Sequence, residues 1–150
     1  MDHTHHNSKS NDSEIKLALS ATLHCLLGCG LGEVAGMIIS SVFLFSNLIS
    51  IIISVVLGFI AGLALGILPL KRKGFSTNQA LKTVVIGEGI SIVVMETFEI
   101  LTQVMIPGVM ESHLTDMLFW TGMIISLIIG FVAALPVNYF MVKRGIRHLH

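Results

Sequence analysis

The chain has 150 residues, of which 53% are hydrophobic and only 12% are charged, and its formal net charge is zero. Because soluble domains usually carry about a quarter charged residues, this composition excludes an ordinary soluble domain, and the neutral balance gives no reason to expect nucleic acid as a partner. The mean hydropathy of +0.86 predicts the lipid bilayer as the surrounding medium. We therefore expect a multi-pass protein of the cell membrane.

The chain opens with a polar stretch that contains His3, His5 and His6 and has no apolar period, so disorder is expected there. Four apolar stretches follow, each longer than the ~20 residues that cross a bilayer. They cover about Leu17–Ser41, Asn47–Leu70, Ala80–Ile106 and Asp116–Val142. The fold class is therefore predicted to be all-α, a polytopic membrane protein built as a bundle of four transmembrane helices. The expected organisation is a disordered His-containing tail at 1–13, the transmembrane domain at 14–145, and a short cytoplasmic His-containing tail at 146–150.

Basic residues gather after the second and the fourth apolar stretch. They are Lys71, Arg72, Lys73, Lys82, Lys143, Arg144 and Arg147. The other two links contain no Lys or Arg. Because cytoplasmic links carry the excess of basic residues in membrane proteins, both termini and the middle link are predicted to be cytoplasmic.

The first apolar stretch carries four residues that are expensive inside a bilayer: His24, Cys25, Cys29 and Glu33. At about 100° per residue they share one half of the helix, together with most of the nearby glycines. Ionisable side chains at membrane depth usually face the protein interior and serve a function. The two cysteines are four residues apart, where their Cβ vectors run parallel, so two free thiols are expected rather than a disulfide.

The second apolar stretch has a small residue at every fourth position: Ser50, Ser54, Gly58, Gly62 and Gly66. Such a ridge lets another helix approach closely, which is how helices associate in lipid. The Ser50–Gly66 face is predicted to pack against another helix, and it is the expected contact surface of a homo-oligomer or a larger membrane complex.

The third apolar stretch carries three carboxyl groups, Glu88, Glu96 and Glu99, within a sector of about 80°, together with Met95. An unpaired carboxylate in apolar surroundings is unstable, so these groups need protons, cations or hydrogen-bond partners from a facing helix. The first and third stretches are therefore predicted to face each other and to build one polar site.

The side chains of that site suit a transition metal. Thiolate and imidazole select soft or borderline metals such as Cu(I) and Zn, and a thioether adds a soft ligand. The predicted metal ligands are His24, Cys25, Cys29, Glu33, Met95, Glu96 and Glu99, with Glu88 as a proton or cation group. The first hypothesis is therefore a membrane protein that binds or moves a transition metal, with a copper ion as the preferred cofactor.

Two other functions are compatible with the same residues. A metal-free transporter coupled to protons or cations would use the carboxyl groups alone. An accessory or structural subunit of a larger membrane complex would use the Ser50–Gly66 face for docking, with each buried Cys acting as a small hydrophobic residue. An enzyme is the weakest hypothesis, because the sequence contains no phosphate-binding loop, nucleophile elbow or dinucleotide fingerprint.

Several strings carry a family resemblance: LHCLLGCGLGEVAGM at Leu23–Met37, PGVM at Pro107–Met110, LFW at Leu118–Trp120, and the ending FVAALPVNYFMVKRGIRH. Together they resemble the four-span prokaryotic membrane proteins called domain of unknown function 4396, over nearly all of residues 17–148. Members of that family tend to have His-rich N-terminal tails, as this chain does. The resemblance implies a four-span helical fold, and no site residue is carried over from it.

Overall fold

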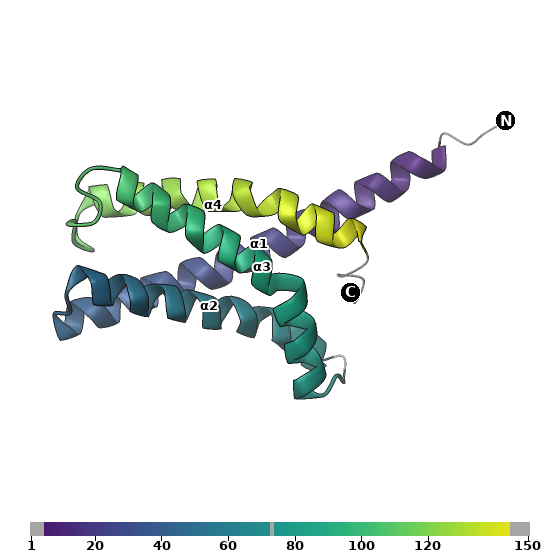
Figure 1. Cartoon of the computed structure of the whole chain (residues 1–150), viewed down its shortest axis with the longest axis horizontal. Helices are drawn as coiled ribbons and strands as arrows, with labels where there is room; N and C mark the ends of the chain where they lie inside the picture. Colours follow the sequence, from purple (N-terminus) through teal and green to yellow (C-terminus); the bar gives the residue numbers. More distant parts are fainter. Residues whose placement is uncertain (1–4, 73, 145–150) are drawn as a thin grey trace.

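The structure is a computed structural model that describes residues 5–72 and 74–144, and these residues form four helices and no strand. The helices are α1 (His5–Phe43), α2 (Asn47–Arg72), α3 (Thr77–Met105) and α4 (Met117–Lys143). They form two hairpins, α1 with α2 and α3 with α4, whose connecting links lie at the same end of the bundle (Figure 1). The predicted all-α fold with four helices is confirmed.

Three of the helices, α1, α2 and α4, are long and apolar enough to cross a membrane. The 26 residues of α2 rise about 39 Å at ~1.5 Å per residue, which exceeds the ~30 Å hydrocarbon core of a bilayer. Helix α3 is longer still, with 29 residues, but it carries three buried glutamates. Its outward face is apolar, with exposed Ile86, Ile90 and Val93, so α3 presents carboxyl groups to the bundle and hydrocarbon to its surroundings.

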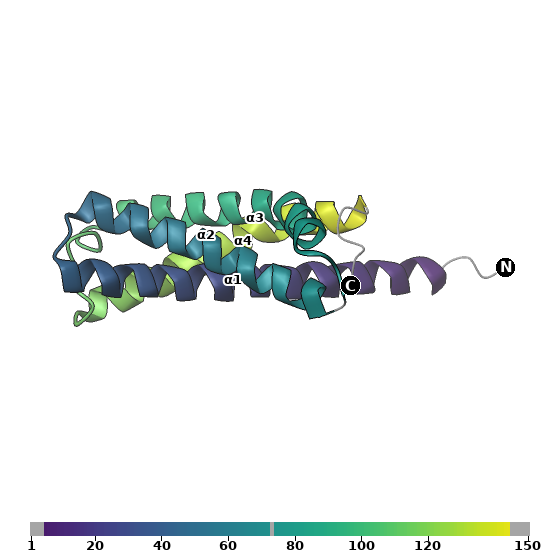
Figure 2. The same ribbon diagram turned by 90° about the horizontal axis from the view of Figure 1, so that it is seen from below.

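The N-terminal part of α1 extends beyond the other helices (Figure 2). The sequence predicted disorder up to residue 13, but α1 begins at His5, so this expectation is corrected for residues 5–13. Adding residues to an existing helix gains one hydrogen bond each without a new nucleation cost, which favours such an extension. Residues 1–4 and the predicted tail at 146–150 lie outside the described residues.

Local signals explain where α3 begins and ends. Ser76 and Gln79 form a capping box, in which the Gln79 backbone N–H donates to Ser76 Oγ at 3.4 Å and the Ser76 N–H donates to Gln79 Oε1 at 3.3 Å. The helix stops before Pro107 and Gly108, and Gly108 has φ +83°, a conformation that favours glycine. The helix begins three residues before the expected Ala80, because the capping box at Ser76 and Gln79 fixes its first turn.

The first two helices cross with their backbones in direct contact. A Cβ atom added to Gly28 would lie 2.5 Å from the Gly62 Cα atom, and one added to Gly32 would collide with the backbone of Gly58. The predicted packing role of the small-residue face on α2 is confirmed, and the partner is α1 of the same chain. Side chains of α3 also lie against this face at Gly58, Gly62 and Gly66. A homo-oligomer or a larger complex held by the same face stays a prediction.

We predict that Gly28→Ala destabilises the bundle whereas Gly30→Ala does not. The new methyl group at Gly28 meets backbone that cannot move aside, and such overpacking costs about 1–3 kcal/mol. At Gly30 the nearest atom would be Leu127 Cδ2 at 3.5 Å, an ordinary contact, so the helix-forming advantage of alanine, about 1 kcal/mol, is gained there. Unfolding of the purified variants in mixed detergent, followed by circular dichroism, measures both. Equal stability of the two variants would contradict the proposed crossing.

Candidate cation site between α1 and α3

The glutamate side chains of α3 occupy space that glycines on the neighbouring helices leave open. A Cβ atom on Gly58 of α2 would lie 2.6 Å from Glu96 Oε1, and one on Gly130 of α4 would lie 2.7 Å from Glu99 Oε1. Any larger residue at either glycine would displace the carboxyl group. The glycines therefore position both α3 carboxyl groups inside the bundle.

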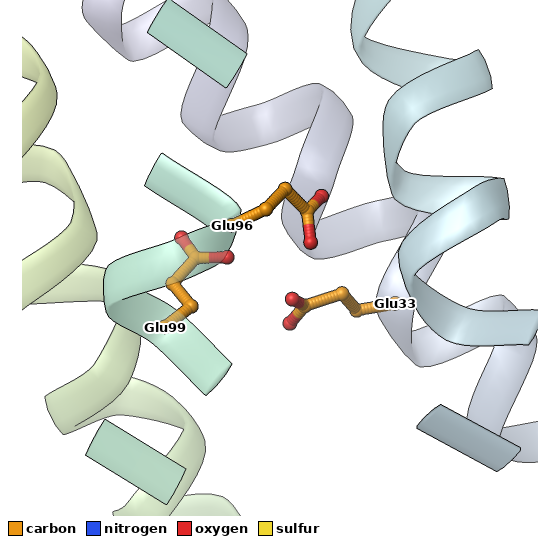
Figure 3. Close-up of side chains that lie close together, drawn as sticks. All are labelled: Glu33, Glu96 and Glu99. Carbon is orange, nitrogen blue, oxygen red and sulfur yellow. The ribbon is translucent and has the colours of Figure 1, made fainter. Parts of the chain in front are cut away.

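A third carboxyl group reaches the same place from α1. Glu33, Glu96 and Glu99 each offer a carboxylate oxygen, and these three oxygens lie within 4.8 Å of one another (Figure 3). The exposed fractions of the three side chains are 6%, 4% and 0%. The prediction that the first and third apolar stretches face each other is confirmed at this point. We call these three residues the carboxyl triad.

Two members of the triad lack hydrogen-bond donors from the described residues. Both carboxyl oxygens of Glu96 and both of Glu99 are buried without a hydrogen-bond partner among the described residues. Two ionised carboxylates about 5 Å apart repel by roughly 3 kcal/mol at an effective dielectric constant of ~20. Three of them require protons shared between the carboxyl groups, or a bound cation, for the arrangement to be stable.

The two thiols adjoin the triad. Cys25 and Cys29 are free and buried, and they pack in one cluster with Ile92, Met95 and Ala134. Cys29 lies one helical turn before Glu33, so sulfur and carboxyl groups follow one another along α1. The expectation of two free thiols is confirmed.

His24 does not join the site and is removed from the predicted ligand set. Its side chain is exposed, and its Nδ1 atom lies 3.2 Å from the carbonyl oxygen of Ser20, one turn earlier. Cys29 lies near the centre of the buried face of α1, and on the helical wheel His24 is about 140° away from it. Sharing half of the wheel was therefore too weak a criterion for membership of the site.

Glu88 is buried but separate from the triad. It lies eight residues before Glu96, which is about 12 Å along the helix axis. Its carboxyl group sits over Gly66 of α2, where an added Cβ atom would lie 2.9 Å from Glu88 Cδ. A direct part in the triad is excluded by this distance.

A cavity of about 220 Å³ leads from the link end of the bundle to Glu33. Much of its lining is polar, and the polar residues are Glu33, Ser40, Ser41, Asn47, Ser50, Ser54, Gln103, Ser112 and His113. We call this cavity the vestibule. The vestibule is not among the features predicted from the sequence, although Ser40 follows Glu33 by seven residues and so lies on the same helix face.

The bundle is closely packed on the other side of the triad. Asn138 Nδ2 of α4 donates a hydrogen bond to Thr22 Oγ1 of α1 at 2.7 Å, and both residues are fully buried. Along α1 the two buried thiols of the packed cluster lie between Thr22 and Glu33. Among the described residues, the vestibule therefore leads from the triad to the link end of the bundle.

We predict that both native thiols are protected in the folded protein. In mild detergent a bulky maleimide should label Cys25 and Cys29 slowly, and sodium dodecyl sulfate should release two reactive thiols per chain without added reductant. His113→Cys in the exposed link provides the control, since the new thiol should react at once in the folded protein. Fast labelling of the native thiols, or a need for reductant, would contradict the described packing.

Comparison with known proteins identifies the chain at the family level. Neither a search of curated proteins nor a search of solved structures gave a match. The family described as "Domain of unknown function (DUF4396)" matches residues 15–147, which covers all four helices except the first residues of α1. The arrangement of α1 and α3 described above lies entirely within the matched region. The chain therefore belongs to the DUF4396 family.

Proposed function

We propose that this protein binds a cation inside the membrane at the carboxyl triad and exchanges it with one side of the bilayer through the vestibule, as a small cation carrier. The observation that supports this proposal is the convergence of three buried carboxyl groups, two of which, Glu96 and Glu99, have no hydrogen-bond partner among the described residues. Buried ionisable groups in membrane helices commonly mark the path of an ion or a proton.

The dimensions of the triad suit a divalent cation. Ligand oxygens bind such cations at about 2.0–2.5 Å, so two oxygens on opposite sides of an ion are at most about 4–5 Å apart. The triad oxygens lie within 4.8 Å of one another. Three carboxylates also exceed the charge of one divalent cation, and oxygen ligands favour hard ions such as Mn²⁺, Mg²⁺ or Ca²⁺ over soft ones. Protons are the alternative occupants of the same groups.

Copper is a second candidate, favoured by one observation. Cys25, Cys29 and Met95 belong to the same packed cluster, directly beside the triad. Thiolate and thioether sulfur select Cu(I), and nearby carboxylates can accept the protons that thiols release when they bind metal. His24 plays no part in this version of the site.

We propose that both termini face the cytoplasm, so that the vestibule opens on the opposite side of the cell membrane. Helices α2 and α4 end in the basic residues Arg72 and Lys143, far from the links that border the vestibule (Figure 1). The excess of basic residues marks the cytoplasmic side of a membrane protein.

This orientation predicts that a reporter protein that works only in the cytoplasm is active when it is fused after His150. His113→Cys should react with a membrane-impermeant thiol reagent added outside intact cells. An inactive reporter at this position, together with no reaction of His113→Cys from outside, would reverse the orientation and the direction in which the vestibule opens.

The cation proposal predicts that Glu33→Gln, Glu96→Gln and Glu99→Gln each weaken binding of Mn²⁺ to the purified protein. Loss of a supporting group around a metal already lowers affinity 10–100-fold, so loss of a ligand should cost about 100-fold or more. The matched control is Glu111→Gln, which removes an exposed carboxyl group from the α3–α4 link. Titration calorimetry and elemental analysis measure the bound ion.

The variant Cys25→Ser/Cys29→Ser separates the two candidates. Copper binding that depends on the thiols, with no effect of the carboxyl variants on Mn²⁺, would favour the sulfur cluster. The triad would be assigned to protons by two results together. The purified protein would bind no metal, and vesicles that contain the wild-type protein would take up protons whereas vesicles with Glu99→Gln would not. A wild-type protein that neither binds metal nor takes up protons would leave the accessory-subunit hypothesis.

A further inference from the structure

We infer that the vestibule contains a second cation position, formed by the hydroxyl groups of Ser40 and Ser54, at which a divalent cation pauses with part of its hydration shell before it reaches Glu33. This inference rests on the proposed function of the triad and adds the route by which the ion is selected. We call it the hydroxyl position.

Ser40 and Ser54 are the two serines of the vestibule whose hydroxyl groups are buried without a partner among the described residues. Ser40 Oγ and Ser54 Oγ are buried, in side chains exposed by 3% and 6%, and they have no hydrogen-bond partner among the described residues. Serine in a helix often satisfies its hydroxyl on the carbonyl one turn earlier, as Ser50 does on Ser46 at 3.0 Å. Both unpartnered side chains line the vestibule.

An unsatisfied buried hydroxyl group costs about 1–3 kcal/mol. Two such groups from different helices on one polar cavity are therefore best explained by a ligand in the cavity. A volume of about 220 Å³ provides space for several water molecules at ~30 Å³ each. Hydroxyl groups can bind a cation through these waters or directly.

The helix crossing sets the order of the groups along the route. An added Cβ atom on Gly36 would lie 2.7 Å from Ser54 Oγ, so Ser54 is level with Gly36, between Glu33 and Ser40. Glu33 and Ser40 are seven residues apart, which is about 10 Å along the axis. The steps from Ser40 to Ser54 and from Ser54 to Glu33 are each roughly one helical turn. A cation thus remains near a protein oxygen throughout its path.

The ion loses its hydration shell in two stages, the first at the hydroxyl position and the second at the carboxyl triad. Neutral hydroxyl groups cannot replace a full hydration shell, and hard divalent cations such as Mn²⁺ and Mg²⁺ give up water reluctantly. The triad carries enough charge to complete the dehydration. The hydroxyl position therefore accepts hydrated divalent cations, and the carboxyl triad binds them after they lose more water.

Ser54→Cys and Ser40→Cys in the full wild-type chain test this position. A thiol in place of a ligand hydroxyl changes the preference from hard to soft ions, so we expect each variant to bind Cd²⁺ about tenfold more tightly than the wild type and to admit Mn²⁺ more slowly. The matched control is Ser91→Cys. Ser91 is also fully buried with an unpartnered hydroxyl, but it lies on α3 and is not part of the vestibule lining.

Titration calorimetry with Cd²⁺ and stopped-flow uptake of Mn²⁺ by vesicles give the two measurements. Equal Cd²⁺ affinity in Ser54→Cys, Ser40→Cys and Ser91→Cys would overturn the hydroxyl position. Ser54→Ala and Ser40→Ala, which keep the close crossing intact, provide a second test, because unchanged Mn²⁺ entry in both would also overturn it. In either case Mn²⁺ binding that still depends on the triad would leave the proposed function standing. A wild-type protein that binds no divalent cation would remove both proposals.

Discussion

The whole arrangement depends on the close backbone contact between α1 and α2. Gly58 shows why. A Cβ atom added to Gly58 would lie 2.6 Å from Glu96 Oε1 and 3.3 Å from the Cys29 carbonyl oxygen. A Cβ atom added to Gly32 of α1 would collide with the Gly58 backbone. The crossing and the carboxyl site therefore share one residue that has no side chain. Small residues give helices in lipid their tightest contacts, and here the same contacts leave room for a charged side chain from a third helix.

The carboxyl triad lowers the stability of the protein that contains it. A bundle of this kind would be more stable with apolar groups in place of three buried carboxyl groups, because removing charge from water is costly unless hydrogen bonds or counter-ions compensate for it. Local rules are broken in this way mainly at functional sites. Glu33 and the unpartnered Ser40 and Ser54 line one cavity, which argues for a common purpose.

The sequence predicts the helices well and their partners less well. Pro107 and the basic residues after Leu70 end apolar runs clearly, so the boundaries of α2, α3 and α4 are close to those expected. The ridge of small residues on α2 identifies a packing face, but periodicity does not say which helix fills it. Glu33, Glu96 and Glu99 could be brought together because lipid cannot satisfy either stripe. The vestibule could not be predicted, because its shape depends on all four helices at once.

The carboxyl groups of α3 also affect how the protein enters the membrane. On insertion scales a charged residue near the centre of a helix costs about 2.5–3.5 kcal/mol, and α3 carries three acidic ones whereas α1, α2 and α4 are apolar enough to cross a membrane. This third helix is therefore expected to be a poor substrate for insertion by itself. Because Gly58 of α2 and Gly130 of α4 make room for its carboxyl groups in the bundle, we expect integration of α3 to be coupled to the synthesis of α4.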